Sequence, residues 1–522
     1  MILYAVAGWV VIEVSSTLLP GLNLPDWTPT LVIALVVLGF PVAVVMAWAF
    51  DIGPQGVTRT SPEPETEARS QASQAEAMAG ETAAKAARPA RPKADGHSIA
   101  VLPFVNMSGD PENEYFSDGI AEEILNLLVK LPQLKVASRT SSFVFKGKDV
   151  NIPTVARELG VSTVLEGSVR QAGGRVRITA QLIDTETDTH LWSETYDREF
   201  KDVFEIQDDI AQSIVKALQV TLSPKERRAI QSVATSDAQA YDFYLRGRSY
   251  MHPMTKRDYE HAIGMYQKAI EIDLKYALAY AGIADAYSHL YRYADASRAN
   301  AEKALEFSDR AIDMDPDSAE ARASRGLALF INEQYEDAEK EFGRAIDLNP
   351  NLFEAYYYAG LALTSQARFD RAVEMYLKAR EVSPTDYQPV IFLAQAYASL
   401  GRKHDEMKAR LASIDLIERH IQMNPHDSRA LCIGANQLSN IGEMDRGMKM
   451  AEEALRRGED EPLVLYNIAC FYALRGDTKQ ALDLLERGVE WGWGDRAWLE
   501  TDSDLDAIRD EPRFQALLRK IR

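Results

Sequence analysis

The fold is decided by residues 318–384, which read SAEARASRGLALFINEQYEDAEKEFGRAIDLNP and then NLFEAYYYAGLALTSQARFDRAVEMYLKAREVSP. One pattern occurs twice here at an unchanged spacing of 34 residues: Gly326 matches Gly360, Ala338 matches Ala372, Phe342 matches Tyr376, Ala345 matches Ala379 and Pro350 matches Pro384. Small residues let two helices of a hairpin approach closely, an aromatic side chain fills the space beside them, and proline ends the unit because it cannot continue a helix. The stretch therefore predicts two helix-turn-helix repeats.

A helical repeat of this length resembles the tetratricopeptide repeat family. The same template fits neighbouring segments on both sides and predicts an all-α solenoid of about seven repeats over residues 237–493. A solenoid must cover its last hydrophobic face, so residues 494–522 are expected to form capping helices.

The resemblance implies a concave groove, lined by the first helix of each repeat, that binds a protein or peptide partner. Aromatic and aliphatic residues dominate the positions that the register places there, although such residues at helical spacing equally fit a buried core. Most of the Lys, Arg and Asn residues of the variant that clamps a terminal carboxylate are missing, so that specificity is not expected. The predicted groove residues are Tyr244, Arg248, Glu320, Leu327, Phe330, Glu354, Tyr357, Leu361, Gln388, Ile391, Gln395 and Tyr466.

The composition excludes several classes of function. A chain of 522 residues is too long for one core, so several domains are expected. Its net charge of -20 and the lack of a basic cluster in the sequence argue against a nucleic-acid partner. The eight histidines and two cysteines show no metal-ligand spacing, and no nucleophile or phosphate-loop motif occurs. We therefore expect a non-enzymatic protein without a cofactor or metal.

The amino-terminal region, residues 1–53, predicts a two-helix transmembrane hairpin with helices at about 2–22 and 30–50. A signal peptide is the weaker alternative, because a charged leader and a cleavage site are missing. Glu13 would be an intramembrane carboxyl, either functional or hydrogen-bonded and neutral. Arginines after the second helix favour soluble domains in the cytoplasm, and hence a protein of the bacterial inner (cytoplasmic) membrane with the lipid bilayer as a partner.

A compositional change separates this region from the next domain. Residues 54–96 are rich in Ala, Glu, Pro and Ser and predict a disordered linker. Residues 97–222 predict an α+β domain of two strand-helix pairs, three further strands and a closing helix. Val176, Ile178, Ala180 and Leu182 alternate with polar residues, as expected of a strand with one buried face.

Four runs in this domain carry a second resemblance: SIAVLPFVNMSGDPENEYFSDGIAEEI, SRTSSFVFKGKDV, VLEGSVR and RITAQLIDTETDTHLWSETYDR. They resemble the TolB amino-terminal-like, or FlgO-like, domain of bacterial membrane proteins. In that group the domain is often followed by tetratricopeptide repeats, and some relatives carry a nucleotide cyclase or winged-helix domain. The predicted fold class is therefore multidomain, with a transmembrane hairpin, a TolB-N/FlgO-like α+β domain and an all-α solenoid.

Two loops of the α+β domain carry charged residues that could bind a ligand. Arg139, Lys146 and Lys148 form a candidate anion-binding loop, with an ordinary loop as the alternative. Asp184, Glu186 and Asp188 begin like a calcium loop, but Thr189 and Thr195 stand where it needs Gly and Glu. The sequence thus predicts no metal site.

The resulting hypothesis is a membrane-anchored scaffold or sensor that binds protein partners through its groove, with homo-oligomer formation left open. The alternatives are the regulatory half of a signalling system, related to cyclases or winged-helix regulators, and a periplasmic envelope-assembly factor.

Overall fold

The computed structural model describes residues 50–53, 56–59, 97–131, 133–148, 150–223, 226, 235–252, 255–459, 461–492 and 496–521. The chain forms two compact units, Met1–Arg91 and Pro92–Arg522. In the first unit, strands β1 (Phe50–Gly53) and β2 (Gly56–Arg59) pair in antiparallel orientation, with Gly53 opposite Gly56. Strand β2 lies where the linker was predicted to begin.

The predicted transmembrane hairpin is corrected by the structure. Among the described residues, none of the helices combines the length and the apolar character needed to cross a bilayer. The predicted helices at 2–22 and 30–50, with Glu13, lie outside the described residues except for Phe50, which begins β1 instead of ending a helix. Its backbone pairs across the hairpin with Arg59, so the polar groups that a helix would satisfy along the chain are satisfied between strands. The predicted inner-membrane localisation depended on the hairpin and is corrected with it.

The second unit begins with a mixed sheet in the order β5-β3-β6-β7-β8, with β4 also paired to β6. Strand β3 is parallel to β5 and β6, whereas β6, β7 and β8 form an antiparallel meander. The meander follows from the tight turn at Gly173 and Gly174, both of which have positive φ. The strands are β3 (Ser98–Val101), β4 (Val105–Asn106), β5 (Lys135–Val136), β6 (Thr163–Ala172), β7 (Arg175–Asp184) and β8 (Thr189–Glu199).

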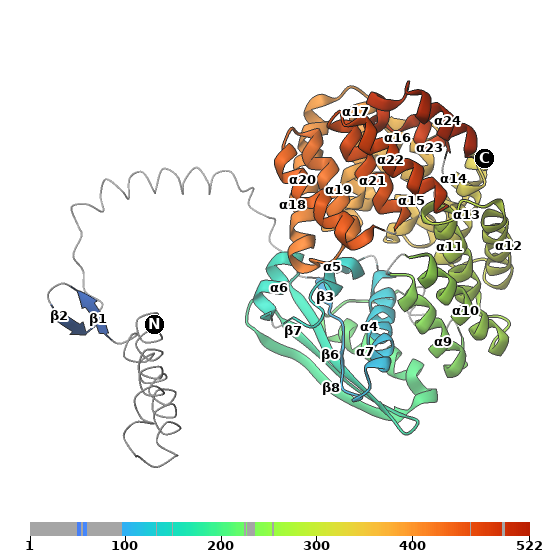
Figure 1. The fold of residues 1–522 in the computed structure, drawn as a ribbon. Helices are drawn as coiled ribbons and strands as arrows, with labels where there is room; N and C mark the ends of the chain where they lie inside the picture. The colour runs from blue at the N-terminus through green and yellow to red at the C-terminus, as the bar shows by residue number, and fades with distance from the viewer. Residues whose placement is uncertain are drawn as a thin grey trace, which may run out of the picture. The chain divides into compact units, whose positions relative to one another are not determined.

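Helices cover both faces of this sheet because side chains alternate along each strand. Ile99 and Val101 pack with helices α4 (Glu114–Val129) and α7 (Val203–Ala217). Ala100 packs on the opposite side with residues of α6 (Ile152–Leu159). Figure 1 shows α4 and α7 side by side against the sheet. The predicted alternation in β7 is confirmed, since Val176, Ile178, Ala180 and Leu182 are buried and the residues between them are more exposed.

The rest of the unit is helical. Within residues 235–492, as far as they are described, seven helix pairs follow one another, and each helix packs on its sequence neighbours. Figure 1 shows them as a curved double layer. The pairs are α9 (Ala238–Tyr250) with α10 (Lys256–Ile272), α11 (Ala277–Tyr293) with α12 (Arg298–Met314), α13 (Ala319–Ile331) with α14 (Tyr335–Leu348), α15 (Phe353–Ser365) with α16 (Phe369–Val382), α17 (Gln388–Ser399) with α18 (Lys403–Met423), α19 (Ser428–Asn440) with α20 (Met444–Gly458), and α21 (Pro462–Leu474) with α22 (Thr478–Glu490).

The packing inside a repeat explains the residue pattern seen in the sequence. A Cβ atom on Gly326 of α13 would lie 2.5 Å from the Phe342 ring of α14, so only glycine lets this ring lie across the first helix. Gly360 and Tyr376 stand in the same relationship one repeat later. The expected role of the small and aromatic positions is confirmed.

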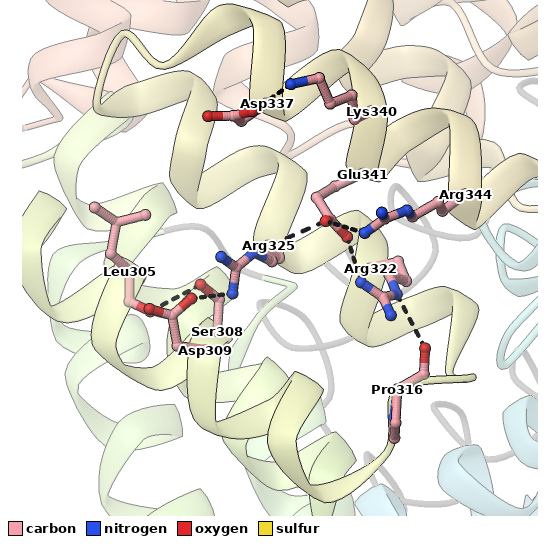
Figure 2. A network of polar contacts seen from close by, with 10 residues as sticks. All are labelled: Leu305, Ser308, Asp309, Pro316, Arg322, Arg325, Asp337, Lys340, Glu341 and Arg344. Carbon is pink, nitrogen blue, oxygen red and sulfur yellow. Dashed lines mark hydrogen bonds and ion pairs between the residues drawn. The ribbon is translucent and has the colours of Figure 1, made fainter.

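Ion pairs add to the packing of α13 and α14 and also connect them to α12 of the preceding repeat. Glu341 of α14 is 7% exposed and accepts hydrogen bonds from Arg322 at 2.8 Å and Arg344 at 2.9 Å. Arg325 lies 4.0 Å from the same carboxylate and also contacts Asp309 of α12 (Figure 2). The network therefore joins three consecutive helices.

The carboxyl-terminal segment closes the array. It consists of α23 (Arg496–Thr501), the short 3-10 helix η4 (Ser503–Ile508) and α24 (Pro512–Lys520). Its apolar residues are buried together with α21 and α22. These residues are Leu505, Ile508, Phe514, Leu517, Leu518 and Ile521.

Candidate functional site

The α+β layer and the first repeat are joined through α4. This helix packs on α9, where the Leu245 side chain lies 2.7 Å from the position of a Cβ on Gly119. Glycine at this position allows the close contact, and one hydrophobic core continues from β3 through α4 and α9 into the later repeats. The layer and the array are thus packed as one body.

Buried charges lie in this joint. Glu122 of α4 is 4% exposed and is bound by Arg139 at 3.0 Å and by Arg248 of α9. Arg248 also donates to Glu123 at 3.2 Å and to the Tyr244 hydroxyl at 3.3 Å. Although burial opposes ionisation, the guanidinium groups of Arg139 and Arg248 lower the pKa of Glu122 to about 2. Glu122 is therefore a permanent anion that holds two cations.

This arrangement places two of the predicted groove residues. Tyr244 is buried and Arg248 contacts α4, so the groove of the first repeat already holds a helix of the same chain. Spacing within the repeat could not reveal this, because Glu122 and Arg248 are 126 positions apart.

The other predicted groove residues divide into buried and accessible ones. The apolar and aromatic members lie in the core, as the alternative interpretation of each held. Tyr466 contacts Asp502 and accepts a hydrogen bond from Trp498 at 2.8 Å, within the carboxyl-terminal cap. The buried members are Leu327, Phe330, Tyr357, Leu361, Ile391 and Tyr466, whereas Glu320, Gln388 and Gln395 are half-buried and Glu354 is exposed.

The three residues of the predicted anion loop contact oxygens of the chain itself. Helix α5 (Arg139–Phe143) carries Arg139, which binds Glu122. Lys146 binds Glu114 at 3.0 Å and also contacts Asp118. Lys148 donates to the carbonyl oxygen of Met423 at 2.6 Å, at the end of α18. The segment thus links the α+β layer to a late repeat.

A pocket of about 80 Å³ opens where the layer meets the repeats. Helices α4 and α7 line one side, and α9, α11 and α13 line the other. Tyr241 accepts a hydrogen bond from Gln207 at 2.5 Å in its wall, and Glu123 accepts one from Asn126 at 3.2 Å. The polar and charged lining residues are Glu123, Asn126, Lys130, Gln207, Asp208, Thr235, Tyr241, Tyr244, Arg248, Tyr276 and Glu320.

A second polar cluster, also missed by sequence analysis, lies among the first helices of the repeats. Arg429 of α19 donates to Gln388 at 3.2 Å, and Gln388 also accepts from Tyr357 at 3.2 Å. The Arg429 guanidinium lies 5.2 Å from the centre of the Tyr293 ring of α11. The cluster joins α11, α15, α17 and α19, which are far apart in sequence.

Metal ligands are not grouped in the described part of the chain: no cluster of three or more His, Cys, Asp or Glu residues there could hold an ion. Cys432 and Cys470 are free and buried. Burial raises the pKa of the Cys470 thiol, and the Asp502 carboxylate adds to the rise. Both thiols act as small core residues.

Comparison with known families supports the periodicity of the array. A family model described as tetratricopeptide repeat matches residues 297–353 and 332–387. The helix pairs α13–α14 and α15–α16 are tetratricopeptide repeats. The match confirms the resemblance inferred from the 34-residue spacing. It does not extend to residues 97–222, where the FlgO-like resemblance stays a prediction.

Solved structures and one sequence relative match parts of the chain. A structure of MamA is 24% identical, covers 34% of this chain and 96% of its own, and has a TM-score of 0.27. A structure of YrrB, described as a TPR protein with an unusual peptide-binding site, is 20% identical, covers 38% and 95%, and has a TM-score of 0.25. A Rhizobium meliloti (strain 1021) protein named "Putative adenylate cyclase 3" is 41% identical over 253 residues, which is 48% of this chain and 42% of that protein. This chain therefore spans less than half of that relative.

Proposed function

We propose that this chain is a non-enzymatic scaffold whose tetratricopeptide array binds a protein or peptide partner. The contacts between α9 and α4 support this function. Arg248 of α9 binds the carboxylates of Glu122 and Glu123 on α4, and Leu245 packs against Gly119 of the same helix. The array thus has the side chains to hold a helical segment. Since α4 fills the groove of the first repeat, the partner would bind to later repeats.

The chemistry of the accessible groove suggests what this partner carries. Glu354 of α15 is exposed, and Gln388 and Gln395 of α17 are half-buried. The groove positions that the sequence suggested to be apolar are in the core, and Gln388 is already bound by Arg429, which leaves the Glu354 carboxylate and the Gln395 amide to meet the partner. A segment with Lys or Arg side chains fits such a surface.

Site-specific photocrosslinking tests this proposal. A photoreactive amino acid at Gln395 should give one discrete adduct with a protein of the native cell. The same amino acid at Glu374, an exposed residue on the second helix of the preceding repeat, should give none. Glu354→Lys should abolish the Gln395 adduct by charge repulsion, while Glu374→Lys should leave it intact. Equal adducts at both positions would refute binding through the groove.

A second candidate function is regulation of a catalytic domain. It is favoured by the Rhizobium relative named as an adenylate cyclase, although the matched part is less than half of that protein. A chimera tests it: the matching 253-residue segment of this chain replaces that of the relative, and cyclic AMP production is measured. Regulated production in the chimera, together with none from this chain alone, would support the regulatory function. The relative without its matching segment serves as the control. A chimera that produces cyclic AMP in the same way as this control would contradict the regulatory function.

A further inference from the structure

The pocket at the joint has the size of a small-molecule site. Its volume of about 80 Å³ corresponds to roughly five to eight ordered waters. Five helices from two parts of the fold line it, so its walls exist only when the α+β layer is packed on the repeats. A ligand of a few non-hydrogen atoms would fill it.

The charges around the pocket favour a cation. Three carboxylates line it, from Glu123, Asp208 and Glu320, against the two bases Lys130 and Arg248. Arg248 binds Glu122 and Glu123, and Arg139 also binds Glu122, so these two carboxylates and two guanidinium groups balance one another. Asp208 and Glu320 are therefore left facing one lysine, Lys130.

Burial is the main cause of the raised pKa of two of these carboxylates. Burial raises the pKa of Glu123; the Arg248 guanidinium and Lys130 oppose this rise, whereas the carboxylates of Glu122 and Glu320 add to it. Burial also raises the pKa of Asp208, with further increases from Asp209 and Glu205. A bound cation would relieve this repulsion.

One wall of the pocket offers a free hydroxyl group and aromatic rings. Tyr276 is 1% exposed and lines the pocket, and its hydroxyl has no hydrogen-bond partner among the described residues. This hydroxyl is not among the fully enclosed polar atoms without a partner, so a ligand or water in the pocket can reach it. The Tyr244 and Tyr276 ring centres are 5.0 Å apart, and such faces attract alkylammonium groups.

We propose that this pocket binds a small, free alkylammonium compound. The ammonium group donates hydrogen bonds to Glu123 and Glu320 and to the free Tyr276 hydroxyl, and the short hydrocarbon chain lies against the tyrosine rings. Because the ligand contacts α4 and α7 on one side and α9, α11 and α13 on the other, it strengthens the joint between layer and array. This site goes beyond the proposed scaffold function and does not require a protein partner.

Calorimetric titration of the full chain with butylamine and 1,4-diaminobutane tests the proposal. At least one amine should bind saturably at one site, whereas 1,4-butanediol, of the same length but uncharged, should not bind. Glu320→Gln should weaken binding by about tenfold, because a charge-assisted hydrogen bond is lost. Tyr276→Phe keeps the ring and should weaken binding by about threefold.

Glu271→Gln is the matched control, since Glu271 is an exposed carboxylate on α10 away from the pocket. It should leave affinity unchanged, and circular dichroism should show that all three variants are folded. Failure of both amines to bind saturably would overturn the proposal, as would equal affinity for the diol. Equal effects of Glu320→Gln and Glu271→Gln would also overturn it. Binding of a lysine-containing peptide without binding of free amines would instead assign the pocket to a protein side chain.

Discussion

Arg248 Nη1 of α9 lies 3.2 Å from Glu123 Oε1 of α4, and the same guanidinium also contacts Glu122. These contacts join residues more than 120 positions apart and lie between the α+β layer and the first repeat. Continuous apolar packing surrounds them. The layer is therefore held by the array through both burial and charge, in a groove that a partner would otherwise occupy.

Arg248→Met tests the charge part of this joint. The substitution keeps the aliphatic stem but leaves the buried carboxylate of Glu122 with Arg139 alone. Removing one partner of a buried ion pair typically lowers stability by about 3 kcal/mol, and we expect this loss in urea unfolding. Arg298→Met removes a solvent-exposed pair with Glu302 and should have little effect. Equal losses in the two variants would show that burial of Glu122 does not matter.

Gly326→Ala tests the packing inside a repeat. The added Cβ would lie 2.5 Å from the Phe342 ring, which is itself buried, so the helices must move apart. Overpacking of this kind should lower the free energy of unfolding by about 1–3 kcal/mol.

Gly343→Ala is its control on the next helix. No atom lies within 4 Å of the Cβ position at Gly343, in the interior of α14. Alanine should therefore raise the free energy of unfolding by about 0.5–1 kcal/mol through helix propensity alone. The opposite signs of the two changes, measured by urea unfolding, check the packing model; a loss in both variants would count against it.

Glu341→Gln tests the network shown in Figure 2. The neutral amide leaves Arg322, whose side chain is 14% exposed, without a carboxylate partner among the described residues. We expect a loss of about 2 kcal/mol in thermal or urea unfolding, because a largely buried guanidinium loses its counter-charge and keeps only its hydrogen bond to the Pro316 carbonyl oxygen. Asp337→Asn removes only the exposed pair with Lys340 and should leave the midpoint nearly unchanged. An unchanged midpoint in Glu341→Gln would mean that the network adds nothing to stability.

Local patterns in the sequence were enough to predict the repeats and the sheet. Gly326 and Phe342 recur as Gly360 and Tyr376 because in each repeat an aromatic ring of the second helix packs against a glycine of the first helix. Ile178 and its apolar neighbours alternate along β7 because one face of the strand is buried. In both cases the cause lies within one repeat or one strand.

The site depended on contacts that such patterns do not contain. Tyr244 and Arg248 occupy groove positions by register, yet α4 covers them, and the joint pocket takes its lining from five helices. The aromatic groove residue Tyr357 is in the core because neighbouring first helices pack on one another. The apolar segment ending at Phe50 suggested a membrane helix, but Phe50 itself is in a strand.

The Asp285 carboxyl on α11 makes the stability of the fold depend on pH. Burial raises the pKa of this carboxyl to about 7, and the Glu354 carboxylate adds to the rise. The folded state therefore keeps a proton that the unfolded chain loses near pH 4, so stability falls as pH rises from about 4 to 7 and stays low above it. Asp285→Asn removes this dependence. Its advantage over the wild type in urea unfolding should grow by about 2 kcal/mol between pH 5 and pH 8.

Asp313→Asn provides the comparison, because Asp313 is exposed on the neighbouring helix α12. Its difference from the wild type should be the same at both pH values. If the advantage of Asp285→Asn is also the same at pH 5 and pH 8, Asp285 is ionised throughout this range in the folded protein. The negative charge of Asp285 would then be stabilised in place at neutral pH, despite the nearby Glu354 carboxylate.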